Sequence, residues 1–349
     1  MTSLPGILSI GIANPPRRYS QPDIYDLIAL HSPFYRNERI RDVFMHSEID
    51  FRHFYFDIET VDPNESTDQL HNRFRQGAIE IGTKAIQQCL TAGSIDVSEV
   101  DFFVAVSCTG YLCPGLSALL LRELGMRTDI QRADLLGMGC AGAMPGLQRA
   151  CDFVRAYPGK KALVLTVEIC SACYYIDDSL ETVVGNAICS DGAAAFIVGM
   201  TMETNIPKVE RFDTLIEPSL IESVGFEQRD GRLRIILSKD IRDVAGRLAN
   251  TLITRLLTSA RLSRKDISHW ILHSGGRKVI EGLKNELSLS DDQVQYSKSV
   301  LRNYGNMSSP TVLFVLDETM RSARTMPGDT GIMLAMGPGL ALESALLRW

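Results

Sequence analysis

A single cysteine, Cys140, lies among small residues where an apolar segment gives way to an amphipathic one. Gly137 and Gly139 precede it, and Ala141 and Gly142 follow it. Small residues permit a tight bend and leave room for a substrate beside the sulfur. A thiol at a helix N-terminus faces unpaired N–H groups and the positive end of the helix dipole, which favour the thiolate. The pattern predicts a nucleophilic Cys140 of lowered pKa, although a core cysteine in a crowded turn fits the local sequence equally well.

Acyl chemistry at a thiolate needs a base and a group that stabilises an oxyanion, and the sequence offers a candidate for each. His273 ends an apolar run and precedes Ser274 and two glycines, a position where active sites of α/β folds gather. Asn306 lies between Gly305 and a Ser-Ser-Pro turn, where its amide can donate to a developing negative charge. Taken singly, His273 also fits a structural role at a strand end, and Asn306 fits an ordinary turn.

The composition is that of a globular protein and excludes several other classes. Of 349 residues, 45% are hydrophobic and 22% are charged, and the formal net charge of −6 argues against nucleic acid as the main partner. No apolar run is long enough for a membrane span, and the N-terminus does not resemble a signal peptide. We therefore expect a cytoplasmic protein whose eight cysteines are free thiols.

Cys170 and Cys173 have the C-x-x-C spacing found in metal and redox sites. They follow a buried-strand pattern, ALVLTVEI, and no second C-x-x-C pair or histidine pair at metal-ligand spacing accompanies them. The sequence therefore predicts no metal site.

Two kinds of segment alternate along the chain and must position these residues. Apolar runs such as GILSIGIA, DFFVAVS and HWILHSG are typical of buried strands, and the amphipathic segments between them are typical of helices. This alternation predicts an α/β fold with helices on both faces of its sheets. A helix, a connector and a strand follow one another in residues 78–110 and again in 244–276, which indicates a duplicated fold. We place the seam in the polar segment 201–219, between an N-terminal half of residues 1–205 and a C-terminal half of residues 206–349.

Four motifs taken together resemble one family. GMGCAGAMPGL holds Cys140, HSGGRKVI holds His273, YGNMSSPTVLF holds Asn306, and AMGPGL lies near the C-terminus. In this order the motifs resemble those of the chalcone synthase-like type III polyketide synthases of the thiolase superfamily, over nearly the whole chain. The resemblance implies the five-layer αβαβα thiolase fold, built from two duplicated halves, and a catalytic Cys-His-Asn triad. It also implies a homodimer, CoA thioesters as substrates (malonyl-CoA and an acyl-CoA starter), and no further cofactor.

The resemblance assigns a CoA entrance and an acyl pocket as well. The CoA-binding positions are Arg39, Arg41, His46, Gly275 and Gly276. Asp42 stands where the family has a basic residue, and the basic side chains nearby also fit a solvated helix face. The pocket positions are Cys108, Thr109, Cys113, Cys170, Cys173, Cys189, Ile235, Ser308, Met336, Gly337, Pro338 and Gly339. Several cysteines replace larger or polar family residues and predict a cavity of small apolar side chains, and Cys113 stands where a family residue crosses the dimer interface.

The implied mechanism is a decarboxylative condensation. Cys140 holds the acyl group, malonyl-CoA loses carbon dioxide, and His273 and Asn306 donate hydrogen bonds to the enolate oxygen while the carbanion attacks. We expect malonyl-CoA as starter and extender, and a small aromatic product. A long acyl starter stays open, because Cys189 and Ile235 remove bulk from the pocket. The motifs are also compatible with a non-catalytic acyl-binding partner and with a single-round synthase acting on carrier-bound substrates.

Overall fold

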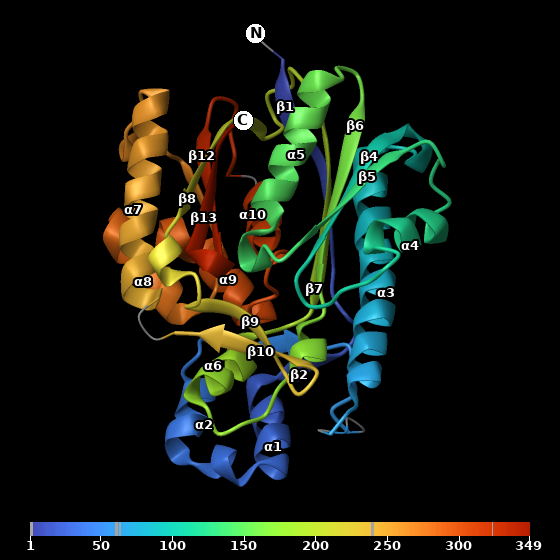
Figure 1. Cartoon of the computed structure of the whole chain (residues 1–349). Helices are drawn as coiled ribbons and strands as arrows, with labels where there is room; N and C mark the ends of the chain where they lie inside the picture. Colours follow the sequence, from blue (N-terminus) through green and yellow to red (C-terminus); the bar gives the residue numbers. More distant parts are fainter. Residues whose placement is uncertain (1–2, 60–61, 63, 239–240, 323) are drawn as a thin grey trace.

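The computed structural model describes residues 3–59, 62, 64–238, 241–322 and 324–349. Nine strands of this part of the chain form one mixed sheet, in two sets that meet where Gly6 pairs with Lys208 (Figure 1). In sheet order, the N-terminal set is β1 (Leu4–Ala13), β7 (Gly192–Thr201), β6 (Lys161–Glu168), β4 (Val100–Ser107) and β5 (Gln131–Leu136). The C-terminal set is β8 (Lys208–Ile216), β13 (Ala341–Arg348), β12 (Thr330–Gly337) and β11 (His269–Leu272).

The two sets share one topology, which confirms the predicted duplication. β7 runs antiparallel to its neighbours β1 and β6, and β6 runs parallel to β4. In the other set, β13 runs antiparallel to β8 and β12, and β12 runs parallel to β11. The predicted helix-connector-strand repeat is also present. α3 (Thr67–Gly93) leads through residues 97–99 into β4, and α7 (Ile241–Ala260) leads through residues 264–266 into β11.

Helices and strands pack in the five predicted layers. α5 (Ala143–Ala156) and α10 (Thr311–Arg321) form the middle layer between the two sets of strands (Figure 1). α3 and α4 (Leu116–Glu123) cover the outer face of the N-terminal set, and α7 and α8 (Arg277–Leu287) cover that of the C-terminal set. Because successive side chains of a strand point to opposite faces, Val164 of β6 packs on the middle layer and Leu165 on the outer one.

Local sequence sets the ends of the long outer helix α3. Ser66 and Gln69 form a capping box at its start, and Ser94 ends it in the left-handed conformation. The helix lies directly on the backbone of β1, because a Cβ on Gly11 would stand 2.4 Å from the carbonyl oxygen of Ala85. A glycine is required at this position of the strand.

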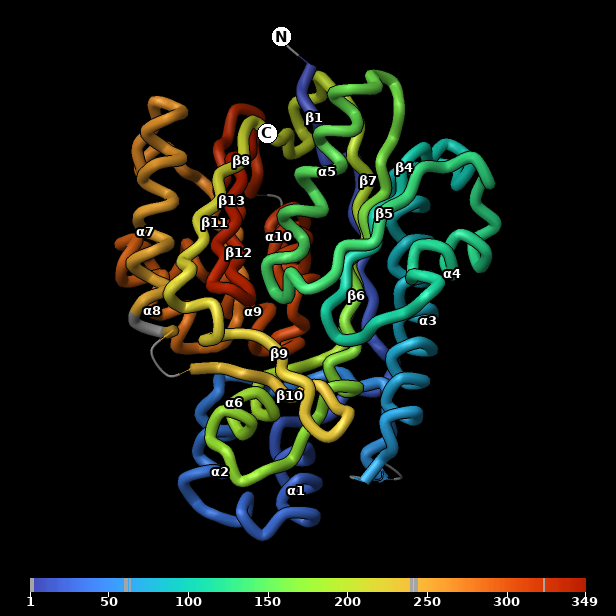
Figure 2. Tube along the Cα trace, in the orientation of Figure 1, coloured from blue at the N-terminus to red at the C-terminus, as the bar shows by residue number. Residues whose placement is uncertain are grey.

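A group of small elements lies at the lower end of the sheet (Figure 2). It comprises α1 (Gln21–His31), α2 (Glu38–Met45), α6 (Leu180–Ile188), the β2–β3 pair (Arg18–Ser20 and Phe51–His53) and the β9–β10 hairpin (Val224–Arg229 and Arg232–Leu237). Side chains of α1, α2 and α6 share an apolar cluster of their own. Within the described residues, no helix combines the length and the hydropathy that a membrane crossing needs.

The predicted seam segment, residues 201–219, contains a nine-residue strand that was not predicted. This segment contains β8, which pairs with β13 and meets β1. Its polar side chains have partners on α7, where the guanidinium of Arg255 donates to both carboxylate oxygens of Asp213. The predicted boundary after residue 205 lies in the connection between β7 and β8.

Candidate active site

The three predicted catalytic residues lie where regular elements end. Cys140 occupies the single turn between β5 and α5, His273 follows β11, and Asn306 follows α9 (Gln295–Tyr304). The Cys140 thiol points to the side-chain oxygen of Asn306, with Sγ 4.0 Å from Oδ1. The Asn306 side-chain nitrogen lies 3.3 Å from the carbonyl oxygen of Gly275. Gly275 in turn lies against the imidazole of His273, because a Cβ added to it would stand 3.3 Å from Nε2.

Backbone contacts fix the orientation of Asn306. Its N–H donates to Ile188 at 2.8 Å and its carbonyl accepts from Ser190 at 2.9 Å, which holds it beside Cys189 in a short parallel bridge. The N–H of Ser308 donates to Asn306 Oδ1 at 2.8 Å, so this atom is the amide oxygen. The amide nitrogen carries two N–H groups, and Gly275 accepts from one. The second N–H is therefore available to a bound oxyanion.

The predicted Met336–Gly339 segment packs directly against the turn that carries Cys140. A Cβ on Gly337 would stand 2.6 Å from the carbonyl oxygen of Met138, and a Cβ on Gly139 would stand 2.2 Å from Cδ of Pro338. Gly139 also has a φ of +49°, a region that favours glycine. The two segments fix each other's backbone, and only glycine fits at the contact points.

The predicted lowering of the Cys140 pKa is wrong. Cys140 does precede α5, and no side chain caps the N-terminus of that helix. Desolvation nevertheless raises the pKa of Cys140 to about 12, although hydrogen bonds with Ser308 and Asn306 oppose the rise. Burial is the largest cause of this rise, because it disfavours the charged thiolate.

His273 is a buried, neutral imidazole. Its side chain is 1% exposed, and desolvation lowers its pKa to about 4. Its Nδ1 atom is buried and has no hydrogen-bond partner within the described residues. A neutral imidazole has one nitrogen that donates and one that accepts. His273 can therefore receive a proton from a nearby thiol or donate to a developing oxyanion.

A buried carboxylate, Glu168, lies beside the triad and was not predicted. Its Oε2 accepts from the N–H groups of Cys108 and Thr109 at 2.9 and 3.1 Å, and its Oε1 accepts from the Ser309 hydroxyl at 2.7 Å. Burial raises its pKa, and these hydrogen bonds oppose the rise. Glu168 is the last residue of β6, within the mainly apolar run ALVLTVEI, and a polar residue at a strand end is the signal that singled out His273. The carboxylate links the loops after β4 and β6 to the segment after Asn306.

Four of the predicted pocket residues, Cys108, Cys170, Cys173 and Cys189, place their thiols in the same region as Cys140. Cys108 and Ser308 lie with Sγ and Oγ 3.4 Å apart, and the thiol of Cys173 donates to the Thr109 carbonyl at 3.3 Å. Cys189 is the neighbour of Asn306 in the bridge. All eight cysteines are free, as expected. Within the described residues, no three His, Cys, Asp or Glu side chains are grouped to hold a metal ion.

Other predicted residues lie away from this cluster. Arg39, Arg41 and His46 are exposed on or next to α2, and His46 contacts the carbonyl of Asp42. Cys113 is exposed in the loop after β4. The side chain of Ile235, on β10, packs against Gly185 of α6. None of the contacts described for these side chains reaches the triad, so their predicted roles stay predictions.

A half-buried cysteine at the start of a central helix, facing an amide and near a buried imidazole, defines an acyl-transferring site on a thiolase-like fold. Residues 58–261 match the family of FAE1/type III polyketide synthase-like proteins, and residues 222–349 match the C-terminal domain of chalcone and stilbene synthases. The chain belongs to the type III polyketide synthases, acyltransferases whose general reaction is the condensation of malonyl-CoA.

Relatives and solved structures cover the chain from end to end. It is 35% identical to the 3,5-dihydroxyphenylacetyl-CoA synthase of Streptomyces toyocaensis, over 99% of this chain and 90% of the relative. It is 30% identical to the 1,3,6,8-tetrahydroxynaphthalene synthase of Streptomyces peucetius subsp. caesius, over 98% of this chain and 93% of the relative. The crystal structure of PKS-I from the brown alga Ectocarpus siliculosus superposes with a TM-score of 0.93 at 27% identity, covering 100% of this chain and 99% of the other.

The raised pKa of Cys140 predicts how its alkylation depends on pH. Well below the pKa of a thiol, the thiolate fraction grows about tenfold for each pH unit. The rate constant for alkylation of Cys140 by iodoacetamide should therefore rise about tenfold for each pH unit between about pH 7 and 9. Quantitative peptide mapping of Cys140 over time gives the rate constant. A rate constant that is already flat from about pH 6 upward would show a thiolate–imidazolium pair instead.

Proposed function

We propose that the protein uses malonyl-CoA as both starter and extender and forms a small aromatic product such as 3,5-dihydroxyphenylacetyl-CoA. The observation that carries the proposal is the contact between the Cys140 thiol and the Asn306 amide, beside the buried His273. The chain is also 35, 34 and 33% identical to three 3,5-dihydroxyphenylacetyl-CoA synthases over almost its whole length. The contact supports a condensing enzyme, and the similarity to these synthases supports the proposed starter and product.

The geometry suits a sequence of covalent and decarboxylative steps. The Cys140 sulfur attacks the thioester carbonyl of the starter and CoA leaves as the thiol, with His273 as the nearby neutral base. Malonyl-CoA then loses carbon dioxide, and the electron pair passes onto its thioester oxygen as an enolate. The free N–H of Asn306 and the N–H of His273 donate to that oxygen. The carbanion attacks the acyl-Cys140 carbonyl, the C–S bond breaks, and the chain is two carbons longer.

The thiols of Cys108 and Cys189 lie near Cys140. Small side chains at these positions accommodate a small starter and also leave room for a longer one, so the length of the starter is decided by product analysis. We propose that Arg39, Arg41, His46, Gly275 and Gly276 bind the CoA moiety and that no cofactor takes part.

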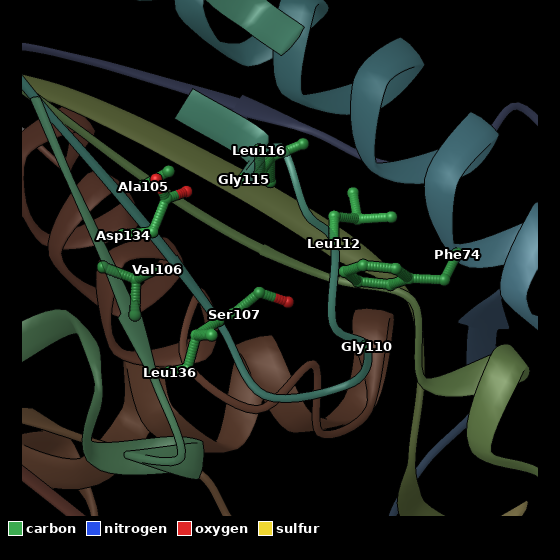
Figure 3. Close-up of a pocket in the computed structure, with 10 residues that line it drawn as sticks. All are labelled: Phe74, Ala105, Val106, Ser107, Gly110, Leu112, Gly115, Leu116, Asp134 and Leu136. Atoms are coloured by element: carbon green, nitrogen blue, oxygen red, sulfur yellow. The ribbon is translucent and has the colours of Figure 1, made fainter. Parts of the chain in front are cut away.

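We also propose a twofold homodimer through the β5 edge of the sheet. β5 pairs with β4 on one side and ends the sheet on the other. Beside it, the loop after β4 bounds a small pocket with Phe74, Leu112 and Leu136 in its lining (Figure 3). Leu136 is 47% exposed in the single chain, and Tyr111 of the same loop is 66% exposed. A free strand edge flanked by exposed apolar side chains is suited to cover by a second copy.

Substitution of the triad tests the proposed chemistry. Cys140→Ala should abolish condensation, because no acyl-enzyme forms. Cys140→Gln should still release carbon dioxide from malonyl-CoA, because the enolate donors remain. Asn306→Ala should slow that decarboxylation by about a hundredfold, since it removes an oxyanion donor. Labelled carbon dioxide and thioester products measure the two steps.

Cys89→Ala is the matched control for these variants. Cys89 is a buried cysteine on the outer helix α3, and its thiol forms a hydrogen bond with the Ser9 hydroxyl. It should retain condensation. Equal carbon dioxide release by Asn306→Ala and the unmodified protein would contradict the assigned role of the amide.

Product analysis tests the starter. Purified protein given malonyl-CoA alone should form a malonyl-derived aromatic thioester, identified by mass spectrometry. Activity that appears only when octanoyl-CoA or a longer acyl-CoA is added would identify a long-chain alkylpyrone or alkylresorcinol synthase. In that case Cys189→Phe should shorten the accepted chain. Absence of turnover with every CoA thioester would favour a non-catalytic acyl-binding partner or a carrier-dependent synthase.

The proposed dimer predicts a particle of twice the chain mass of 38.6 kDa by light scattering. Leu136→Asp should shift the particle towards a monomer, because it places a carboxylate in an apolar contact. Leu180→Asp is the control, since Leu180 has a similar exposure of 49% but lies on α6. A monomeric unmodified protein at working concentration contradicts the dimer.

A further inference from the structure

The first residue of α10 is a buried threonine, Thr311, whose side chain bonds to the loop that carries Asn306. Thr311 is 0% exposed. Its hydroxyl oxygen accepts from the N–H of Met307 at 2.9 Å, and its own N–H donates to the carbonyl of Ser308 at 3.1 Å. The loop between Asn306 and α10 is therefore closed on the first residue of a helix of the middle layer.

The Thr311 hydroxyl has a single acceptor for its proton. A hydroxyl carries one proton to donate and two lone pairs that accept, and the N–H of Met307 already occupies one lone pair. Among the groups that the structure describes, the proton has one acceptor, Asn306 Oδ1, which lies 3.4 Å from Oγ1. Because Thr311 is buried, its hydroxyl is directed to the oxygen of the catalytic amide.

Donors of three kinds converge on Asn306 Oδ1. The N–H of Ser308 lies at 2.8 Å, the Thr311 hydroxyl at 3.4 Å and the Cys140 thiol at 4.0 Å. Ser308 presents its N–H from a backbone with a φ of +59°, which is uncommon for a residue other than glycine. Once the Cys140 sulfur carries an acyl group it has no proton to donate. The N–H of Ser308 and the hydroxyl of Thr311 are then the donors that remain.

These two donors select one of the two orientations of the amide. The terminal torsion of an asparagine side chain has two alternatives, which exchange the oxygen and the nitrogen. In the exchanged orientation the amide nitrogen would meet the N–H of Ser308, so that two donors face each other, and the Thr311 proton would lose its acceptor. The observed orientation leaves an N–H of Asn306 for the substrate oxygen.

We propose that Thr311 is a positioning residue for the condensation, whose hydroxyl keeps an N–H of the Asn306 amide turned towards the enolate oxygen. Thr311 acts through Asn306 and does not touch the substrate. The role of Thr311 rests on the proposed function, because it takes Asn306 as a donor to the enolate. The other donor, the Ser308 N–H, belongs to the backbone, so Thr311 is the one that a side-chain substitution removes.

Two substitutions at Thr311 separate its hydroxyl from its shape. Thr311→Val removes the hydroxyl and should lower kcat for carbon dioxide release from labelled malonyl-CoA about tenfold, the scale of one hydrogen bond. KM for malonyl-CoA should change by less than about twofold, since the substrate makes no contact with Thr311. Thr311→Ser keeps the hydroxyl and should keep kcat. A serine variant as slow as the valine variant would contradict the role of the hydroxyl.

Thr319→Val is the matched control, because Thr319 is a buried threonine of the same helix. Its hydroxyl donates to the carbonyl of Val315 at 2.7 Å, inside α10. It should keep kcat, and an equal loss in this variant would assign the effect to the helix instead. Thermal unfolding shows which variants are folded. Thr311→Ala also lacks the hydroxyl and takes the place of the valine variant, with the same expected loss, if valine prevents folding.

A double variant tests whether Thr311 acts through the amide. In the Asn306→Ala background there is no amide to orient, so adding Thr311→Val should cause no further loss of carbon dioxide release. A further loss as large as that in the single variant would show that Thr311 acts independently of Asn306 and would overturn the proposal.

The Asn306→Ala variant alone distinguishes a failure of the proposed function from a failure of this inference. Undiminished carbon dioxide release by Asn306→Ala would overturn the donor role of Asn306, and the positioning role of Thr311 with it. Slow release by Asn306→Ala together with full release by Thr311→Val would leave the proposed function intact and overturn the role of Thr311 alone.

Discussion

The burial of α5 and α10 between two sets of strands is the constraint on which the site depends. The first N–H groups of a helix have no partner within the helix. A helix that is buried between two sets of strands therefore has to begin where other groups can accept from these N–H groups. Cys140 lies just before α5, and Asn306 lies a few residues before α10. These are equivalent positions of the duplicated halves. The Cys140 thiol and the Asn306 amide therefore meet because the two equivalent loops lie at the same end of the shared middle layer. His273 and Cys108 likewise follow equivalent strands, β11 and β4.

The same burial decides the charge state of the site. Removing a thiol and an imidazole from water favours the neutral form of each, which is why the pKa of Cys140 is raised and that of His273 is lowered. Glu168 adds a carboxylate nearby, surrounded by hydrogen-bond donors. The raised pKa of Cys140 and the lowered pKa of His273 both act against an ion pair between the two side chains.

The sequence predicted the fold class, and it placed the three candidate catalytic residues at the ends of regular elements. Buried strands read as apolar runs, and Cys140, His273 and Asn306 each lie beside glycines at element ends. β8 was hidden because its polar side chains, such as Asp213, are satisfied by a helix far away in the sequence. The direction of the Cys140 pKa needed the burial itself, which no local pattern reveals.

The duplication is incomplete, and that incompleteness limits how copies of the chain can associate. β5 has no counterpart in the C-terminal set, so the sheet has two unlike edges. The β5 edge is six residues long, whereas the opposite edge strand, β11, has four residues. Short edge strands are poor templates for further pairing. Two copies joined at β5 leave only β11 edges outward, so an assembly that begins there ends at two and cannot grow into a fibre. In the proposed dimer, the extra strand that breaks the internal symmetry of the chain would thereby limit the assembly to two copies.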